Sequence, residues 1–168
     1  MATISMIAAI GKNNELGKNN NLIWHISEDL KFFKKETLNK KVILGRKTLE
    51  SLPGLLKGRT HLVLTSKHLE ESENLKVFKS IEDLLKYIDT LDEEVIVIGG
   101  GKIYKDFLPY ANKLILTEIN DTKDADTYFP DFDKKKYEKK ILCTHNESGI
   151  EYKHVIYKKK SCYYSQPR

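Results

Sequence analysis

Residues 41–51 read KVILGRKTLES, and this short run sets the expected fold class. Its first half, Lys41–Gly45, has an apolar centre that is typical of a strand buried on both faces of a sheet. Its second half predicts a helix over about Arg46–Ser51. A buried strand that passes directly into a helix is the repeating unit of an α/β protein with a parallel sheet.

The same alternation of apolar strands and helices extends in both directions along the chain. Further strands are predicted at Thr3–Ile10, Thr60–Thr65, Leu75–Phe78, Val95–Ile98 and Lys113–Ile119. Further helices are predicted at about Glu28–Thr37, Ile81–Leu91 and Lys102–Leu108, the last of which ends before Pro109. Two longer segments, Tyr137–Thr144 and Glu151–Lys159, predict an antiparallel hairpin around residues 146–149. We therefore expect one α/β domain over residues 1–160, with a mostly parallel central sheet, flanking helices and a C-terminal antiparallel hairpin, and then a short tail over 161–168.

The composition indicates a globular domain with a sizeable core, because the chain has 168 residues, of which 40% are hydrophobic and 32% charged. The apolar run Ile4–Ile10 has no basic segment before it and is too short to span a bilayer, so no membrane partner is expected. Cys143 and Cys162 form neither a disulfide framework nor a metal-spaced cluster, which favours a reducing cytoplasm and predicts no metal site. The net charge of +5 favours anionic partners, either small phosphorylated molecules or nucleic acid.

Two strand-to-helix junctions carry groups that suit anion binding. At residues 98–104, IGGGKIY, the glycines allow a ligand to approach the backbone closely and leave amides free for a phosphate. This run has neither the Walker A spacing nor the Gly-x-Gly-x-x-Gly dinucleotide fingerprint. At Gly45–Thr48 two cations and a hydroxyl stand where a helix begins, and Thr65–Lys67 adds hydroxyls and a cation at another strand end. Either junction alone is equally compatible with a close-packing turn, but two in one chain favour a ligand with several phosphates.

Residues 17–37 contain the only tryptophan, Trp24, in an asparagine-rich segment that we expect to be a flexible loop. Ser27 is suited to be the N-cap of the helix that follows. Asp29 lies one turn before Phe33 and projects on the same side, so its carboxylate is poorly solvated when ionised. Alternatively, Asp29 is a solvated acid that complements the helix macrodipole. The local sequence leaves both interpretations open.

The chain resembles dihydrofolate reductase, in its bacterial form, over essentially its whole length. The order and spacing of several segments carry the resemblance, namely residues 4–10, 17–37, 42–51, 58–59, 98–104, 107–109, 116–117 and 126–130. There are two departures. Ile23 precedes the tryptophan where the family usually has proline, and residues 53–57, PGLLK, differ from the usual proline-rich approach to Gly58 and Arg59. Without that proline the loop has more conformational freedom. We therefore expect this chain to differ from the family in the closure of the lid over the cofactor.

The resemblance implies reduction of 7,8-dihydrofolate to 5,6,7,8-tetrahydrofolate by hydride transfer from NADPH. Asp29, supported by Thr117, would promote protonation of the pterin at N5, and Trp24 and Tyr104 would complete the catalytic centre. The folate cleft would be lined by Ile7, Ala8, Asp29, Leu30, Phe33, Leu52, Leu56, Ile98 and Thr117, while Arg59 would bind the α-carboxylate of the glutamate tail. NADPH would contact Ala9, Leu16, Gly17, Asn20, Gly45, Arg46, Lys47, Thr48, Thr65, Ser66, Lys67, Gly100, Gly101, Lys102, Ile103 and Tyr104. The family also places a cis peptide bond between Gly99 and Gly100.

We further expect a monomer whose cleft also accepts antifolate inhibitors. The nearest alternative is a riboflavin-pathway reductase of similar fold, which would also use NADPH but would need neither the pairing of Asp29 with Phe33 nor Arg59. A basic nucleic-acid-binding module is the other alternative, suggested by Lys134–Lys136 and Lys158–Lys160. Lysine runs are usually solvated surface, and the sequence predicts neither aromatic-interleaved strands nor a recognition helix, so no nucleic-acid partner is expected.

Overall fold

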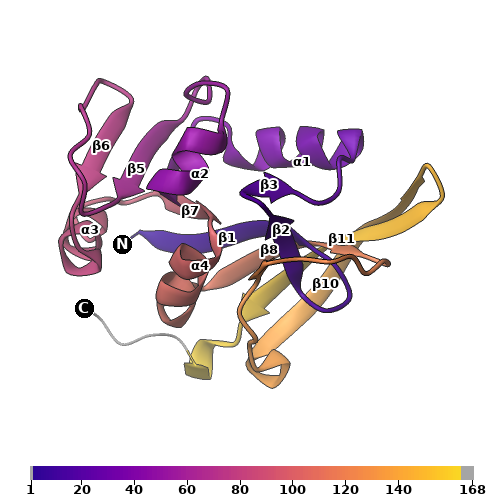
Figure 1. Cartoon of the computed structure of the whole chain (residues 1–168). Coiled ribbons are helices and arrows are strands. Elements are labelled where there is room, and N and C mark those ends of the chain that lie inside the picture. Colours follow the sequence, from indigo (N-terminus) through magenta and orange to yellow (C-terminus); the bar gives the residue numbers. More distant parts are fainter. Residues whose placement is uncertain (1, 164–168) are drawn as a thin grey trace.

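The computed structural model describes residues 2–163, which form two sheets and their covering helices (Figure 1). The larger sheet has eight strands in the order β10-β11-β8-β1-β7-β4-β5-β6. These strands are β1 (Thr3–Ile10), β4 (Lys41–Gly45), β5 (Thr60–Leu64), β6 (Leu75–Phe78), β7 (Glu94–Gly99), β8 (Lys113–Ile119), β10 (Tyr137–Glu147) and β11 (Ile150–Lys159). The helices are α1 (Ser27–Thr37), α2 (Arg46–Ser51), α3 (Ile81–Ile88) and α4 (Gly101–Phe107), with short 3₁₀ turns at Leu108–Tyr110, Lys134–Lys136 and Ser161–Tyr163.

The strands from β8 to β6 in this order are mutually parallel, as the alternation of buried strands and helices predicts. Beyond them, β11 pairs antiparallel with β8, and β10 pairs antiparallel with β11. The predicted fold class, a mostly parallel sheet with a C-terminal antiparallel hairpin, is therefore confirmed.

Successive residues of each central strand pack against opposite helix layers, which is why these strands are predominantly apolar. Ile43 of β4 belongs to the same core cluster as Leu84 of α3 and Phe107 of α4. Its neighbour Val42 packs on the other face with Leu49 of α2. Helices α1 and α2 thus cover one face of the sheet, while α3 and α4 cover the other (Figure 1).

The predicted element boundaries are close to the observed ones, and two differences have local causes. Helix α3 ends at Ile88 rather than Leu91, because Thr90 and Leu91 donate backbone hydrogen bonds to carbonyls three residues earlier and so tighten the chain into a turn. The closing hairpin turn is shorter than predicted. It uses only Ser148 and Gly149, whose φ angles of 55° and 82° suit a two-residue turn of the primed type, so β10 extends to Glu147.

The asparagine-rich segment is not the irregular loop that the sequence predicted. It forms a small sheet of order β3-β2-β9, made of β2 (Glu15–Lys18), β3 (Asn21–Leu22) and β9 (Thr127–Tyr128). Asn19 and Asn20 join β2 to β3 with positive φ angles of 53° and 62°. Asparagine tolerates this left-handed conformation better than most residues, so these asparagines form a hairpin turn.

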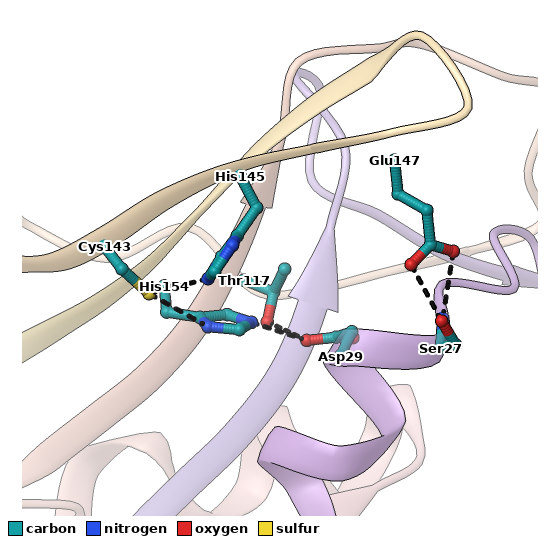
Figure 2. Close-up of polar contacts among 7 residues, drawn as sticks. All are labelled: Ser27, Asp29, Thr117, Cys143, His145, Glu147 and His154. Carbon is teal, nitrogen blue, oxygen red and sulfur yellow. Dashed lines mark hydrogen bonds and ion pairs between the residues drawn. The ribbon is translucent and has the colours of Figure 1, made fainter.

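The prediction that Ser27 caps helix α1 is wrong. Ser27 is the first helical residue, and Ile26 occupies the N-cap position without a side-chain cap. Glu147, at the end of β10, acts in its place: its carboxylate accepts from the Ser27 backbone N–H at 3.1 Å and from the Ser27 hydroxyl at 2.8 Å (Figure 2). These hydrogen bonds lower the pKa of Glu147. A distant carboxylate therefore satisfies the helix end, which no local pattern reveals.

The predicted tail is described only in part. Residues Ser161–Tyr163 form a 3₁₀ turn, and residues 164–168 lie outside the described part of the chain. Among the described helices, none has the length and apolar character needed to cross a membrane.

We expect Glu94, at the start of β7, to stabilise the fold in a way that depends on pH. Burial raises its pKa, but the Lys40 ammonium at 2.6 Å, the Ser5 hydroxyl at 2.6 Å and the Lys113 ammonium at 2.9 Å lower it to about 2, below the ordinary 4.5. Because the folded-state pKa is depressed, the stabilisation is complete above pH 4.5 and is lost as the pH falls toward 2. At about 1.4 kcal/mol for each pKa unit, it amounts to roughly 3 kcal/mol.

We therefore expect Glu94→Gln to lower the free energy of unfolding by roughly 3 kcal/mol at pH 7, and by much less near pH 3. Urea unfolding at both pH values measures the difference. Glu93→Gln is the matched control, because Glu93 pairs with Lys41 on the surface and such pairs contribute about 0–1 kcal/mol. An effect of Glu94→Gln that does not change between pH 7 and pH 3 would contradict this assignment.

Candidate active site

Asp29 lies in the first turn of α1 and is directed toward the sheet. Its side chain is 20% exposed. The Thr117 hydroxyl, on β8, donates to its Oδ1 atom, and His154 Nε2, on β11, lies 3.2 Å from the same oxygen (Figure 2). Thr117 and His154 are register partners on adjacent strands, so both reach one carboxylate. This geometry favours the interpretation of Asp29 as a poorly solvated carboxylate over that of a solvated acid that only complements the helix dipole.

Apolar side chains between α1 and the sheet form a wall beside Asp29. Phe33 packs in one cluster with Ile7 and Ile98, and Leu52 packs in the adjoining cluster that Ile98 also joins. Leu30 differs from these, since it is 47% exposed. The structure thus brings together most of the residues predicted to line the folate cleft.

Two other residues predicted for the cleft have additional contacts. Ala8 is partly buried against the main core of the sheet. Leu56 is partly buried, and its backbone N–H donates to His61 Nε2 at 3.1 Å, which fixes the segment that precedes Arg59.

Arg59 is not the ordinary surface cation that its position in a loop would suggest. It is 8% exposed, its Nε donates to the Thr37 hydroxyl at 3.1 Å, and its terminal nitrogens donate to the backbone carbonyls of Lys34 and Lys57. Burial lowers the pKa of Arg59. Three anchoring hydrogen bonds fix the plane of the guanidinium at the end of α1, and its remaining N–H groups are available to an anionic ligand.

The two predicted anion-binding junctions meet in one pocket of about 710 Å³. A Cβ on Gly100 would lie 3.2 Å from the Thr48 hydroxyl oxygen, so the glycine-rich junction directly faces the start of α2. The peptide bond between Gly99 and Gly100 is cis, as expected. The pocket is lined by the predicted residues Asn20, Gly45, Arg46, Lys47, Thr48, Thr65, Ser66, Gly100, Gly101, Lys102 and Ile103.

Several residues depart from this prediction. Ala9, Leu16, Gly17, Lys67 and Tyr104 were predicted to contact the cofactor, and none of them lines the pocket. The sequence reasoning missed Lys79, Ser80, Ile81 and Glu82, which form another junction, between β6 and α3. The pattern at that junction, an apolar strand followed by Lys-Ser and a helix, resembles the pattern at Gly45–Thr48 and provided the missed signal. Leu64, Asp106 and Thr127 also line the pocket.

Trp24 and Tyr104 are both buried rather than open to solvent. The Trp24 indole N–H donates to Asp121 at 3.0 Å, and its ring packs with Ile26 and Tyr152. The Tyr104 hydroxyl donates to the Ile7 carbonyl at 2.6 Å, and burial raises the pKa of Tyr104. Tyr104 therefore anchors the middle of β1, at Ile7, and does not line the pocket.

A further group of polar residues lies behind Asp29, and the sequence reasoning missed it. Cys143 Sγ lies 3.1 Å from His145 Nε2 and 3.4 Å from His154 Nδ1 (Figure 2). The signal was Cys-x-His at the end of one predicted strand of the hairpin, with His145 one residue beyond the predicted end at Thr144, and a histidine on the other strand. The expectation of no metal site rests on the spacing of the two cysteines, Cys143 and Cys162, which does not include the histidines.

Comparison with known proteins identifies close relatives. A protein-family model described as dihydrofolate reductase matches residues 3–159. The dihydrofolate reductase of Haemophilus influenzae is 41% identical over 136 residues, covering 81% of this chain and 84% of that protein. The Bacillus subtilis enzyme is 36% identical over 163 residues, covering 94% and 95%. A solved structure of dihydrofolate reductase from Enterococcus faecalis, in complex with NADP(H) and RAB-propyl, superposes with a TM-score of 0.85 at 30% identity, covering 95% of this chain and 97% of that one.

Proposed function

This chain belongs to the dihydrofolate reductase family, and we propose that Asp29 is the group through which it promotes protonation of dihydrofolate at N5. The chain is an NADPH-dependent dihydrofolate reductase. The role of Asp29 is supported by the position of its carboxylate, which is held between Thr117 and His154 beside an apolar wall. A pterin edge with adjacent N–H donors would pair with this carboxylate, and the low polarity around it would strengthen the pairing. Loss of NADPH absorbance that requires dihydrofolate, compared between the wild type and Asp29→Asn, tests this proposal.

The pocket between α2, α4 and β5 fits NADPH. Arg46, Lys47, Lys79 and Lys102 supply cations, and Thr48, Thr65 and Ser66 supply hydroxyls, as phosphate groups require. Gly100 and Gly101 leave the backbone open at the same place. When bound, NADPH supplies the hydride that is transferred to C6 of the pterin. The protein's contribution is to align the two ligands and to exclude water from them.

The lid over this pocket is the β2-β3 hairpin. The side-chain amide of Asn20, at its turn, donates to the Lys47 carbonyl at 3.2 Å, so the hairpin contacts the cofactor pocket directly. A Cβ on Gly17 would lie 2.8 Å from the Asn21 carbonyl oxygen, which requires glycine in this tight hairpin. Leu16 and Gly17 therefore shape the lid, and Asn20 is the residue that reaches the pocket.

The pterin would lie against Ile7, Phe33 and Ile98, and the exposed Leu30 and the partly buried Leu52 would contact the rest of the folate. Antifolate inhibitors that carry a similar ring would occupy the same cleft. Because a single domain carries both the cleft and the pocket, the enzyme would act as a monomer. The free thiols of Cys143 and Cys162 fit a reducing cytoplasm.

Arg46 is expected to select NADPH over NADH. It lines the pocket with Ser66 and forms an ion pair with Glu50, which orients its guanidinium. NADPH carries a 2′-phosphate that NADH lacks, so Arg46→Ala should raise the KM for NADPH by about 10- to 100-fold, equivalent to one charge-assisted hydrogen bond. The KM for NADH should change little.

Steady-state kinetics with both cofactors measures this difference. Glu50→Gln is the control, because it removes the partner of Arg46 but leaves the guanidinium in the pocket, and it should retain the preference for NADPH. An equal loss for both cofactors in Arg46→Ala would assign Arg46 to the fold or to the pyrophosphate.

A further inference from the structure

The β10-β11 hairpin places three side chains of metal-ligating type directly behind Asp29. These are Cys143 and His145 on β10 and His154 on β11 (Figure 2). Their ligand atoms, Cys143 Sγ, His145 Nε2 and His154 Nδ1, all lie within 4.8 Å of one another. Neither the activity of the enzyme nor the binding of its two ligands requires this convergence.

The hairpin geometry explains how the three residues meet. Cys143 and His145 are two residues apart on one strand, so their side chains lie on the same face. Cys143 is the register partner of His154 across the hairpin. A bulge between Ile141 and Cys143 shifts the pairing by one residue and creates this partnership, as bulges do where a side chain must be redirected.

Two of the three spacings between the ligand atoms fit a tetrahedral metal ion, and the third, between the two histidine nitrogens, is at most 4.8 Å. Zinc bonds of about 2.3 Å to sulfur and about 2.0–2.1 Å to nitrogen place two tetrahedral ligand atoms about 3.5 Å apart. The two sulfur-nitrogen distances here are 3.1 Å and 3.4 Å. Thiolate and imidazole are the ligand types that Zn²⁺ prefers, and three protein ligands leave a fourth position open for water.

His154 is already fixed in the orientation that a metal ligand needs. Its side chain is 4% exposed, and its ring stacks on Phe32 with the centroids 3.9 Å apart and the planes at 9°. Its Nε2 faces the Asp29 carboxylate at 3.2 Å, which directs Nδ1 toward Cys143. A carboxylate bonded to the far nitrogen of a histidine is the usual arrangement around zinc, where it fixes the tautomer and increases the basicity of the ligand.

Cys143 and His145 are only partly buried, so the site can be reached from solvent. The Tyr152 ring lies against both histidines, with centroid distances of 5.3 Å to His145 and 5.6 Å to His154. Its buried hydroxyl has no hydrogen-bond partner within residues 2–163.

We propose that Cys143, His145 and His154 bind one divalent transition-metal ion of the zinc class, with Asp29 as the carboxylate partner of His154. The metal site is then linked to the substrate site, because His154 joins the ion to the acid that faces the pterin. The link to catalysis rests on the proposed function of Asp29, whereas the metal site itself does not.

Titration of the full chain with Co²⁺, under reducing conditions, tests the site directly. A thiolate bound to Co²⁺ gives a charge-transfer absorption, and we expect one ion per chain, displaced by Zn²⁺. Cys143→Ser should abolish the absorption, and His145→Ala should weaken Co²⁺ binding at least tenfold. Cys162→Ser is the matched control and should bind normally, because Cys162 is exposed and outside the cluster. No charge-transfer absorption, or the same absorption in Cys143→Ser, would overturn the proposal.

The link to Asp29 has its own test, which needs neither NADPH nor dihydrofolate. Zn²⁺ affinity, measured by competition with a chromophoric chelator, should fall by about 10- to 100-fold in Asp29→Asn, as is typical when the carboxylate partner of a ligating histidine is removed. Glu28→Gln removes the neighbouring first-turn acid and should not change the affinity. Equal affinities in the wild type and Asp29→Asn would overturn the link. Because the measurement involves no turnover, it is independent of whether Asp29 promotes N5 protonation.

Discussion

Asp29→Asn is expected to lower the rate of dihydrofolate reduction near neutral pH by about 10²- to 10⁴-fold, the usual contribution of a positioned acid or base. An amide keeps the size and one oxygen of the side chain, so Thr117 can still donate to it and the fold should be retained. NADPH binding should also be retained, because Asp29 does not line the cofactor pocket. The deficit should shrink as the pH falls, since dihydrofolate can then take its proton from solvent.

Glu28→Gln separates the two interpretations of a first-turn acid. Glu28 stands in the same helical turn, pairs with Lys31 at the surface and makes the same contribution to the helix dipole. It should therefore have near wild-type activity. Steady-state rates of the wild type, Asp29→Asn and Glu28→Gln as a function of pH, together with their affinities for NADPH, distinguish the two interpretations. Wild-type turnover of Asp29→Asn at pH 7 would show that Asp29 serves only the helix.

The parts of the fold that could be predicted are those determined by neighbours in sequence. β1, β4, α2, β6 and β8 have the predicted boundaries. For the strands the reason is that an apolar run between polar ends is a local property, and α2 begins directly where the run of β4 ends. The parallel arrangement of the central strands followed from the same runs, since continuous apolar strands separated by helices indicate a parallel sheet with helices on both faces.

What could not be predicted depends on residues that meet only in the folded chain. Ser27 has the composition of an N-cap, yet Glu147, 120 positions away, bonds to its backbone N–H. The sequence predicts no strand at β2, because one of its two partner strands, β9, lies far along the chain. Asn19 and Asn20 themselves form the turn between β2 and β3.

The cluster around Cys143 shows the same limit within the site. Its convergence depends on a one-residue bulge near Ile141, and a sequence pattern with a period of two residues cannot locate such a bulge. Asp29, in contrast, could be singled out because its position one turn before Phe33 is local. Its second partner, His154, could not be identified, because it comes from the last strand of the sheet.

Substitution of Arg59 is expected to have the second large effect, which is on the binding of dihydrofolate rather than on hydride transfer. Its anchored guanidinium can form two parallel hydrogen bonds to the α-carboxylate of the glutamate tail. At about 1.5–3 kcal/mol for each charge-assisted bond, Arg59→Gln should raise the KM for dihydrofolate by about 10²- to 10⁴-fold. The KM for NADPH should stay unchanged, because Arg59 lies outside the cofactor pocket.

Arg59→Lys keeps the charge but loses the planar fork and the hydrogen bond to Thr37, so its loss should be smaller, about tenfold to 100-fold if one of the two bonds is lost. The decisive control is a substrate that retains the pterin and lacks the glutamate tail. The wild type, Arg59→Lys and Arg59→Gln should bind this substrate equally weakly, since it offers residue 59 no carboxylate to contact. If Arg59→Gln lost affinity for the tail-less substrate as much as for dihydrofolate, Arg59 would be stabilising the end of α1 through the Lys34 carbonyl rather than binding the tail.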